Sequence, residues 1–319
     1  VLKSARTLGH NLTHLSGLLE LLRSLLSRGK GAVMGVVEFF KGGRRKAREL
    51  FERITRGSKP HWDEARATAR AQELVAAGRT AHNTKVALET KFKNLIKEHG
   101  LEKRYTTESG RISLCEENCM DLAEVLEEST GSVALGKELR TDAKNLVAAR
   151  KAENAASEEL GQVGAEFKEN TGEPPRTVIP GIGGTGGGKE SFDLLAVDEK
   201  MESIDFVEAK GGLHPKMGRA RSVLPDGSKG EVLEQGTAEY LNHIARQDKN
   251  FLQLLRDNPD LWERIKSGQV TLNNVVCKTP TADLSLIERT TEQFTLEART
   301  IEELDAKLNP PPTTNGTTP

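Results

Sequence analysis

The chain has 319 residues, of which 36% are hydrophobic, and a formal net charge of −1. This length is enough for about two domains, and the near-neutral charge excludes a global field that would attract nucleic acid or an anionic membrane. Three cysteines are too few for a disulfide framework, and the absence of a run of about 18 apolar residues excludes an ordinary transmembrane helix.

The N-terminal half of the sequence has the spacing of helices. Leucines between residues 12 and 26 recur three and four positions apart, which predicts an amphipathic helix, and a second apolar segment covers 33–40. We interpret the two as a helix pair in a bundle, with a hairpin that contacts a membrane as the alternative. The same spacing over 62–100 and 113–160 predicts further helices, so we expect residues 1–145 to be all-α.

The composition changes at residues 171–190, which are rich in Gly and Pro and exclude a long helix or a central strand. Short apolar runs and amphipathic segments follow. We expect them to form two strands, two helices and two more strands, in that order, over 192–197, 204–209, 231–256, 260–267, 269–277 and 293–298. This order predicts a mixed α/β domain over 146–305, and therefore an α+β chain. Residues 306–319, rich in Pro and Thr, are expected to be disordered.

The first two of these strands bring acidic residues together. If they form a hairpin in which Val197 pairs with Ile204, the register places Asp193 opposite Glu208. Because side chains alternate between the faces of a strand, Lys210 shares the face of Glu208. Two opposed carboxylates about 5 Å apart repel each other unless a cation compensates them. Mg²⁺ suits this position, because it takes one or two carboxylates together with waters and phosphate oxygens.

Such an arrangement is suited to phosphodiester hydrolysis. A bound metal lowers the pKa of a water molecule and neutralises charge on the scissile phosphate. Lys210 would orient the attacking water or stabilise the developing negative charge.

The spacing Asp193, fourteen residues, then Glu208-Ala209-Lys210 resembles the PD-(D/E)XK nuclease superfamily. The surrounding segments GGGKESFDLLAVD, FVEAKGG, GRARSVLPDGSKG and QGTAEYLNHIAR are similar to the nuclease domains of bacterial polymorphic toxins, including Rhs-type and contact-dependent toxins. The similarity covers about residues 150–285. Phe192 stands where the superfamily label has Pro.

The resemblance implies a restriction-endonuclease-like core, a mixed sheet flanked by helices. It implies Mg²⁺ or Mn²⁺ bound by Asp193 and Glu208, with a further carboxylate from the preceding helix. We take Glu159 as that ligand, with Glu166 as the alternative. Gln235 would lie beside the metal or the substrate phosphate and support catalysis.

The resemblance also implies a biological role. We expect an endonuclease that favours DNA over RNA and acts as an antibacterial toxin, secreted or injected by its producer and active in the cytoplasm of the target cell. A cognate immunity protein would be its partner. One alternative is an RNase or tRNase on the same scaffold. Another is a helical adaptor or membrane-active protein whose α/β domain is inactive.

Overall fold

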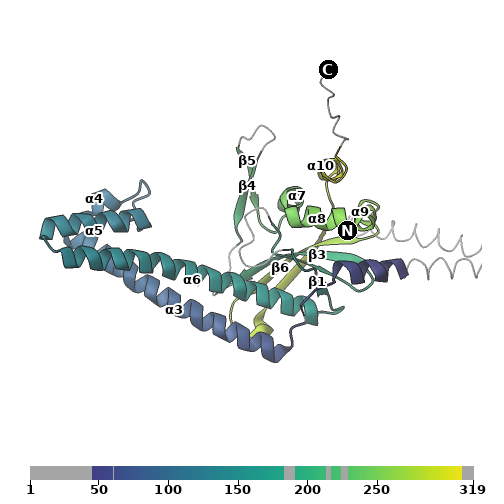
Figure 1. The fold of residues 1–319 in the computed structure, drawn as a ribbon, viewed down its shortest axis with the longest axis horizontal. Coiled ribbons are helices and arrows are strands. Elements are labelled where there is room, and N and C mark those ends of the chain that lie inside the picture. The colour runs from purple at the N-terminus through teal and green to yellow at the C-terminus, as the bar shows by residue number, and fades with distance from the viewer. Residues whose placement is uncertain (1–44, 60, 183–190, 213–216, 224–228, 311–319) are drawn as a thin grey trace, which may run out of the picture.

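The computed structural model describes five stretches of the chain (Figure 1), which are residues 45–59, 61–182, 191–212, 217–223 and 229–310. The two helices predicted over 12–26 and 33–40 lie outside the described residues, as does the end of the predicted tail. Among the helices that the structure describes, none combines the length and the hydropathy needed to cross a membrane.

Two long helices, α3 (Glu64–Glu98) and α6 (Val133–Thr171), run side by side as a hairpin. The short α4 (Glu102–Tyr105) and α5 (Glu116–Thr130) pack at its far end around a hydrophobic core of their own. The helix predicted over 62–100 is thereby confirmed. The pattern over 113–160 forms two helices, and α6 continues through residues 145 and 146, where the sequence predicted a domain boundary.

A mixed sheet follows the helical hairpin. Its strand order is β1-β2-β3-β6-β7, and all neighbours are antiparallel except β3 and β6, which are parallel. The strands are β1 (Thr177–Val178), β2 (Leu194–Val197), β3 (Ser203–Gly211), β6 (Thr271–Thr279) and β7 (Glu288–Phe294). A helical region followed by a five-stranded mixed sheet with flanking helices confirms the predicted α+β class.

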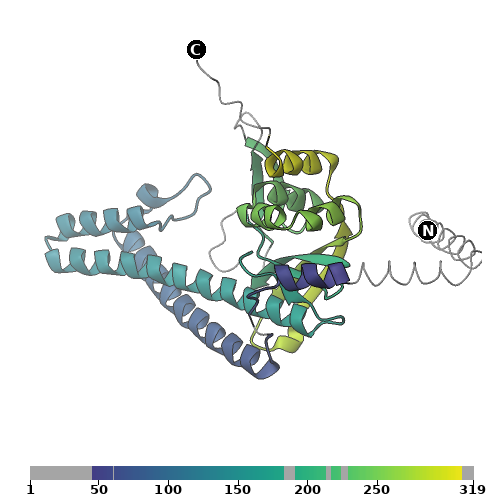
Figure 2. The same ribbon diagram turned by 45° about the vertical axis from the view of Figure 1, so that its right-hand side comes forward.

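Helices cover both faces of the sheet (Figures 1 and 2). Along β3, Phe206 packs into the core on the side of the C-terminal helices, whereas Val207 packs on the side of α3 and α6. This alternation is that of a strand buried on both faces. The helices on the first side are α7 (Ala238–Gln247), α8 (Lys249–Asp257) and α9 (Pro259–Lys266).

The helix predicted over 231–256 is wrong in two places. Residues Lys229–Glu234 form strand β5, which pairs with β4 (Arg219–Val223) in a two-stranded ribbon. Asp248 then separates α7 from α8, because its carboxylate accepts hydrogen bonds from the amides of Asn250 and Phe251 in the first turn of α8.

The chain end also differs from the expectation. The last sheet strand covers Glu288–Phe294 rather than 293–298, and a 3₁₀ turn, η1 (Leu284–Leu286), precedes it. Helix α10 (Ala298–Leu308) begins inside the predicted strand and extends into the tail that was expected to be disordered.

Candidate active site

The β2–β3 hairpin has the register that the sequence predicted. Val197 pairs with Ile204, and Leu194 pairs with Val207. Asp193 directly precedes β2, and its Oδ2 accepts a hydrogen bond from the amide of Ala209 at 2.8 Å. The backbone of β3 therefore holds the Asp193 carboxylate beside residues 208–210.

Lys210 lies between two carboxylates, Asp193 and Glu208, which we call the acidic pair. Its Nζ makes an ion pair with Glu208 Oε1 and lies 3.9 Å from Asp193 Oδ2. The Glu208 side chain is 6% exposed, while that of Asp193 is 34% exposed. The structure thus brings these three predicted residues together, with one carboxylate buried and the other open to solvent.

The electrostatics of Glu208 are unfavourable in this arrangement. Burial is the main cause that raises the pKa of Glu208 to about 7; the charge of Asp193 raises it further, and Lys210 opposes both. Glu208 Oε1 is also buried without a hydrogen-bond partner among the described residues, although the Lys210 ammonium is in ion-pair contact with it. A buried carboxylate oxygen in this state is costly unless a further cation or donor reaches it.

A second buried cluster on the same sheet is compensated. Asp205 and Glu169 are both fully buried, and Arg289 binds both of them at 2.6 and 2.9 Å. Arg176 binds Asp205 at 2.8 Å, and Asn273 donates to the same carboxylate. Burial raises the pKa of Glu169 to about 7 against the pull of Arg289. Two carboxylates meet two arginines here, which is the pattern of a structural network.

Sequence reasoning missed this second cluster. Its members come from α6, from the segment before β1, and from β3, β6 and β7. No local spacing connects them, so no sequence signal of the kind that links Asp193 to Glu208 was available.

Gln235 reaches the site through Tyr240. Its Oε1 accepts from the amide of Gly218 at 2.6 Å, and its Nε2 donates to the Tyr240 hydroxyl at 3.3 Å. Burial raises the pKa of Tyr240 to about 12, and the charges of Glu208 and Asp193 raise it too. Tyr240 is therefore a protonated hydroxyl within electrostatic range of the acidic pair, and Gln235 holds it there.

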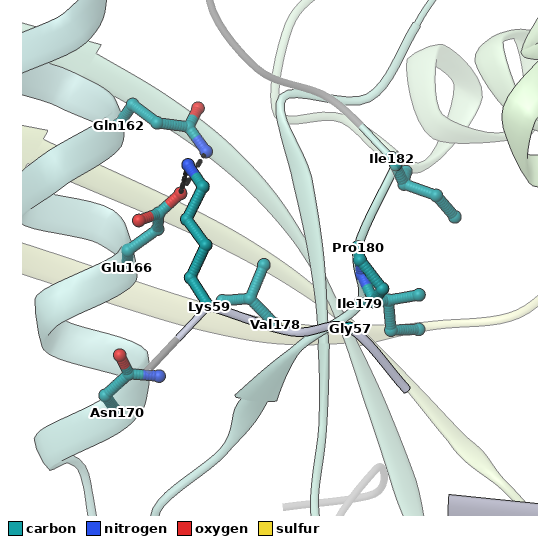
Figure 3. A pocket seen from close by; sticks show the side chains of 10 residues that line it. Gly57, Lys59, Gln162, Glu166, Asn170, Val178, Ile179, Pro180 and Ile182 are labelled. Carbon is teal, nitrogen blue, oxygen red and sulfur yellow. Dashed lines mark hydrogen bonds and ion pairs between the residues drawn. The ribbon is translucent and has the colours of Figure 1, made fainter. Parts of the chain in front are cut away.

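Neither of the two upstream glutamates joins the acidic pair. Glu159 accepts from Arg70 of α3 at 2.9 Å. Glu166 accepts from Trp62 Nε1 at 2.7 Å and from Gln162 at 3.0 Å, and Figure 3 shows the Gln162 amide turned toward its carboxylate. Within the described stretches of chain, no group of three or more His, Cys, Asp or Glu side chains is arranged to hold a metal. Glu159, which the resemblance implied as a metal ligand, pairs with Arg70 in this structure.

The acidic pair still fits a hard divalent cation. Mg²⁺ in phosphoryl-transfer sites takes one or two carboxylates and leaves its other positions to water and substrate oxygens. Asp193 is partly exposed, and the single ammonium of Lys210 is the cation shared by both carboxylates.

Comparisons with models of protein families, with curated proteins and with solved structures found no match to this chain.

Proposed function

We propose that this chain is a metal-dependent endonuclease, with Mg²⁺ or Mn²⁺ held by Asp193 and Glu208. One observation carries the proposal. The acidic pair has a single lysine, whereas Glu169 and Asp205 have two arginines. A divalent cation would remove this imbalance between two carboxylates and one ammonium.

The residues of the site have separate roles in this proposal. The bound ion supplies Lewis-acid chemistry, lowering the pKa of a water molecule and neutralising charge on the scissile phosphate. Lys210, fixed between the two carboxylates, donates hydrogen bonds to the attacking water or to the phosphate oxygens as negative charge develops. Tyr240 stays protonated at neutral pH and serves as a donor rather than a base. Gln235 is a positioning residue that fixes the Tyr240 hydroxyl.

The preference for DNA over RNA rests on the resemblance of the segments around β2 and β3 to toxin nuclease domains. The same resemblance supports an antibacterial toxin that is secreted or injected, acts in the target cytoplasm and is inhibited by an immunity protein. Membrane contact by the N-terminal helices stays a prediction, because those residues lie outside the described part of the chain.

The test incubates the full chain with plasmid DNA, and separately with tRNA, in Mg²⁺, Mn²⁺ or EDTA. We expect cleavage of DNA with either metal and none with EDTA. Glu208→Gln should lower the rate by at least about 100-fold, since removal of even outer-shell partners of a metal costs 10–100-fold. Glu159→Gln is the matched control, because Glu159 pairs with Arg70 instead, and it should retain the wild-type rate.

The two alternatives are separate outcomes of this test. Cleavage of tRNA but not of DNA would make the chain an RNase with the same acidic pair. Wild-type protein that leaves both substrates intact in either metal would overturn the nuclease and favour the helical adaptor or membrane-active protein.

A further inference from the structure

A cavity of about 210 Å³ lies on the sheet next to the acidic pair. Its walls come from the segments just before β4 and just after β5, with Met217, Gln235 and Gly236, and from the neighbouring strands β6 and β7. Strand β6 contributes Val276 and Lys278. The cavity shares Gln235 with the candidate active site, so the two are adjacent.

Strand register places this cavity on the same face as the acidic pair. In the parallel pairing of β3 and β6, Lys210 stands beside Lys278 and Glu208 stands beside Val276. Side chains of directly paired residues point to the same face, and neighbouring strands lie about 4.8 Å apart. Gly236 lies over the same face of the sheet, because a Cβ added to it would be 3.1 Å from Val276 Cγ2.

The two lysines differ in their partners. Lys210 has both carboxylates of the acidic pair. Lys278 is half-buried and makes no ion pair or hydrogen bond through its ammonium with any residue that the structure describes. Glu288, its register partner on β7, also lines the cavity but is exposed and makes no ion pair with it in the described chain. A cation that is partly removed from water without an anion carries an uncompensated desolvation cost.

We propose that Lys278 and this cavity form a subsite for a backbone phosphate of the nucleic-acid strand, next to the phosphate that is cleaved at the acidic pair. The inference rests on the proposed nuclease function. It places the nucleic-acid strand across the sheet, running from β3 toward β6 and β7. The cavity has room for several heavy atoms, since one water molecule occupies about 30 Å³ in liquid water. A phosphate oxygen there gives Lys278 the anion that the chain does not supply.

The experiment measures binding and cleavage separately. Binding of a fluorescent DNA duplex in EDTA is followed by anisotropy over a salt series, and KM and kcat are measured in Mg²⁺. Lys278→Met is compared with Lys278→Arg and with Lys97→Met, which removes an exposed lysine in the last turn of α3. Inorganic phosphate, at constant ionic strength, is the competitor that represents a free anion.

Loss of one phosphate contact lowers the slope of log affinity against log salt by about 0.9, so Lys278→Met should bind about tenfold more weakly near 0.1 M salt. We expect KM to rise by a similar factor with kcat little changed, Lys278→Arg to restore binding, and Lys97→Met to match the wild type.

The inference fails if Lys278→Met and Lys97→Met give the same affinity and the same salt slope while the wild type cuts DNA. It also fails if Lys278 affects inhibition by inorganic phosphate but not DNA binding, since the cavity would then be a small-anion site. A DNA affinity that depends on Lys278 in a protein that does not cut would retain the subsite and refute the nuclease.

Discussion

Glu208 should destabilise the folded chain at neutral pH when no metal is bound. Its pKa is raised from 4.5 in the unfolded chain to about 7 in the folded one, chiefly by burial. Between pH 4.5 and 7 the unfolded chain releases a proton that the folded chain keeps, so the stability falls as the pH rises through this window. At 1.36 kcal/mol per pKa unit, the full cost above pH 7 is about 3 kcal/mol.

Glu208→Gln removes this cost while keeping the shape of the side chain. In EDTA at pH 8 we expect the variant to be more stable than the wild type by up to about 3 kcal/mol, or several degrees in Tm. Near pH 4.5 the two proteins should unfold at the same temperature. Glu169 has a raised pKa as well, but it is present in both proteins and cancels in the difference.

Added Mg²⁺ should reverse the order. An ion at 1,000 times its Kd stabilises the folded state by about 4.1 kcal/mol, which exceeds the cost of about 3 kcal/mol. Only the wild type has the full acidic pair to bind it. The assay is thermal unfolding of both proteins at pH 4.5 and pH 8, each in EDTA and in Mg²⁺. A Glu208→Gln variant that is less stable than the wild type at pH 8 in EDTA would refute the reasoning, because Glu208 would then be a net stabilising group. An equal Mg²⁺ shift in both proteins would show that the ion binds elsewhere.

Lys210, the metal affinity of the acidic pair and the Glu169–Asp205 cluster can be tested in the same way. Lys210→Met should lower the cleavage rate by at least about 100-fold, because the Lys210 ammonium donates to the negative charge that develops in the transition state. The variant should keep the Mg²⁺-dependent rise in Tm. Loss of both the activity and the rise in Tm would make Lys210 part of the metal site. Mg²⁺ affinity, measured by calorimetric titration, should fall about tenfold per pH unit below 7 as protons compete for Glu208, and an affinity that is constant from pH 7 to pH 5 would contradict the buried ligand. Arg289→Met should cost about 3–5 kcal/mol in urea unfolding, with or without Mg²⁺, because it leaves Asp205 and Glu169 short of a cation; a neutral effect would show that the cluster is not a structural network.

The sequence determined the core of the candidate site. Asp193 directly precedes β2, Glu208 and Lys210 lie on β3, and residues 198–202 join the two strands. The apolar pattern of each strand fixes which side chains share a face. A one-residue slip would have turned buried residues to the wrong face, so a register written from local pattern alone was correct. The helix over 62–100 was predictable for the same reason, since its periodic apolar face lies within one continuous segment.

Partners that come from distant segments were decided by the tertiary structure. Glu159 faces Arg70 because α6 returns beside α3, and residues 229–234 form a strand rather than a helix because β4 pairs with them. The pairing of Glu169 with Arg289, and the place of Lys278 beside Lys210, depend on which strands become neighbours in the sheet. Backbone periodicity is set within a few residues, whereas the partner of a charged side chain depends on packing between elements far apart in the chain.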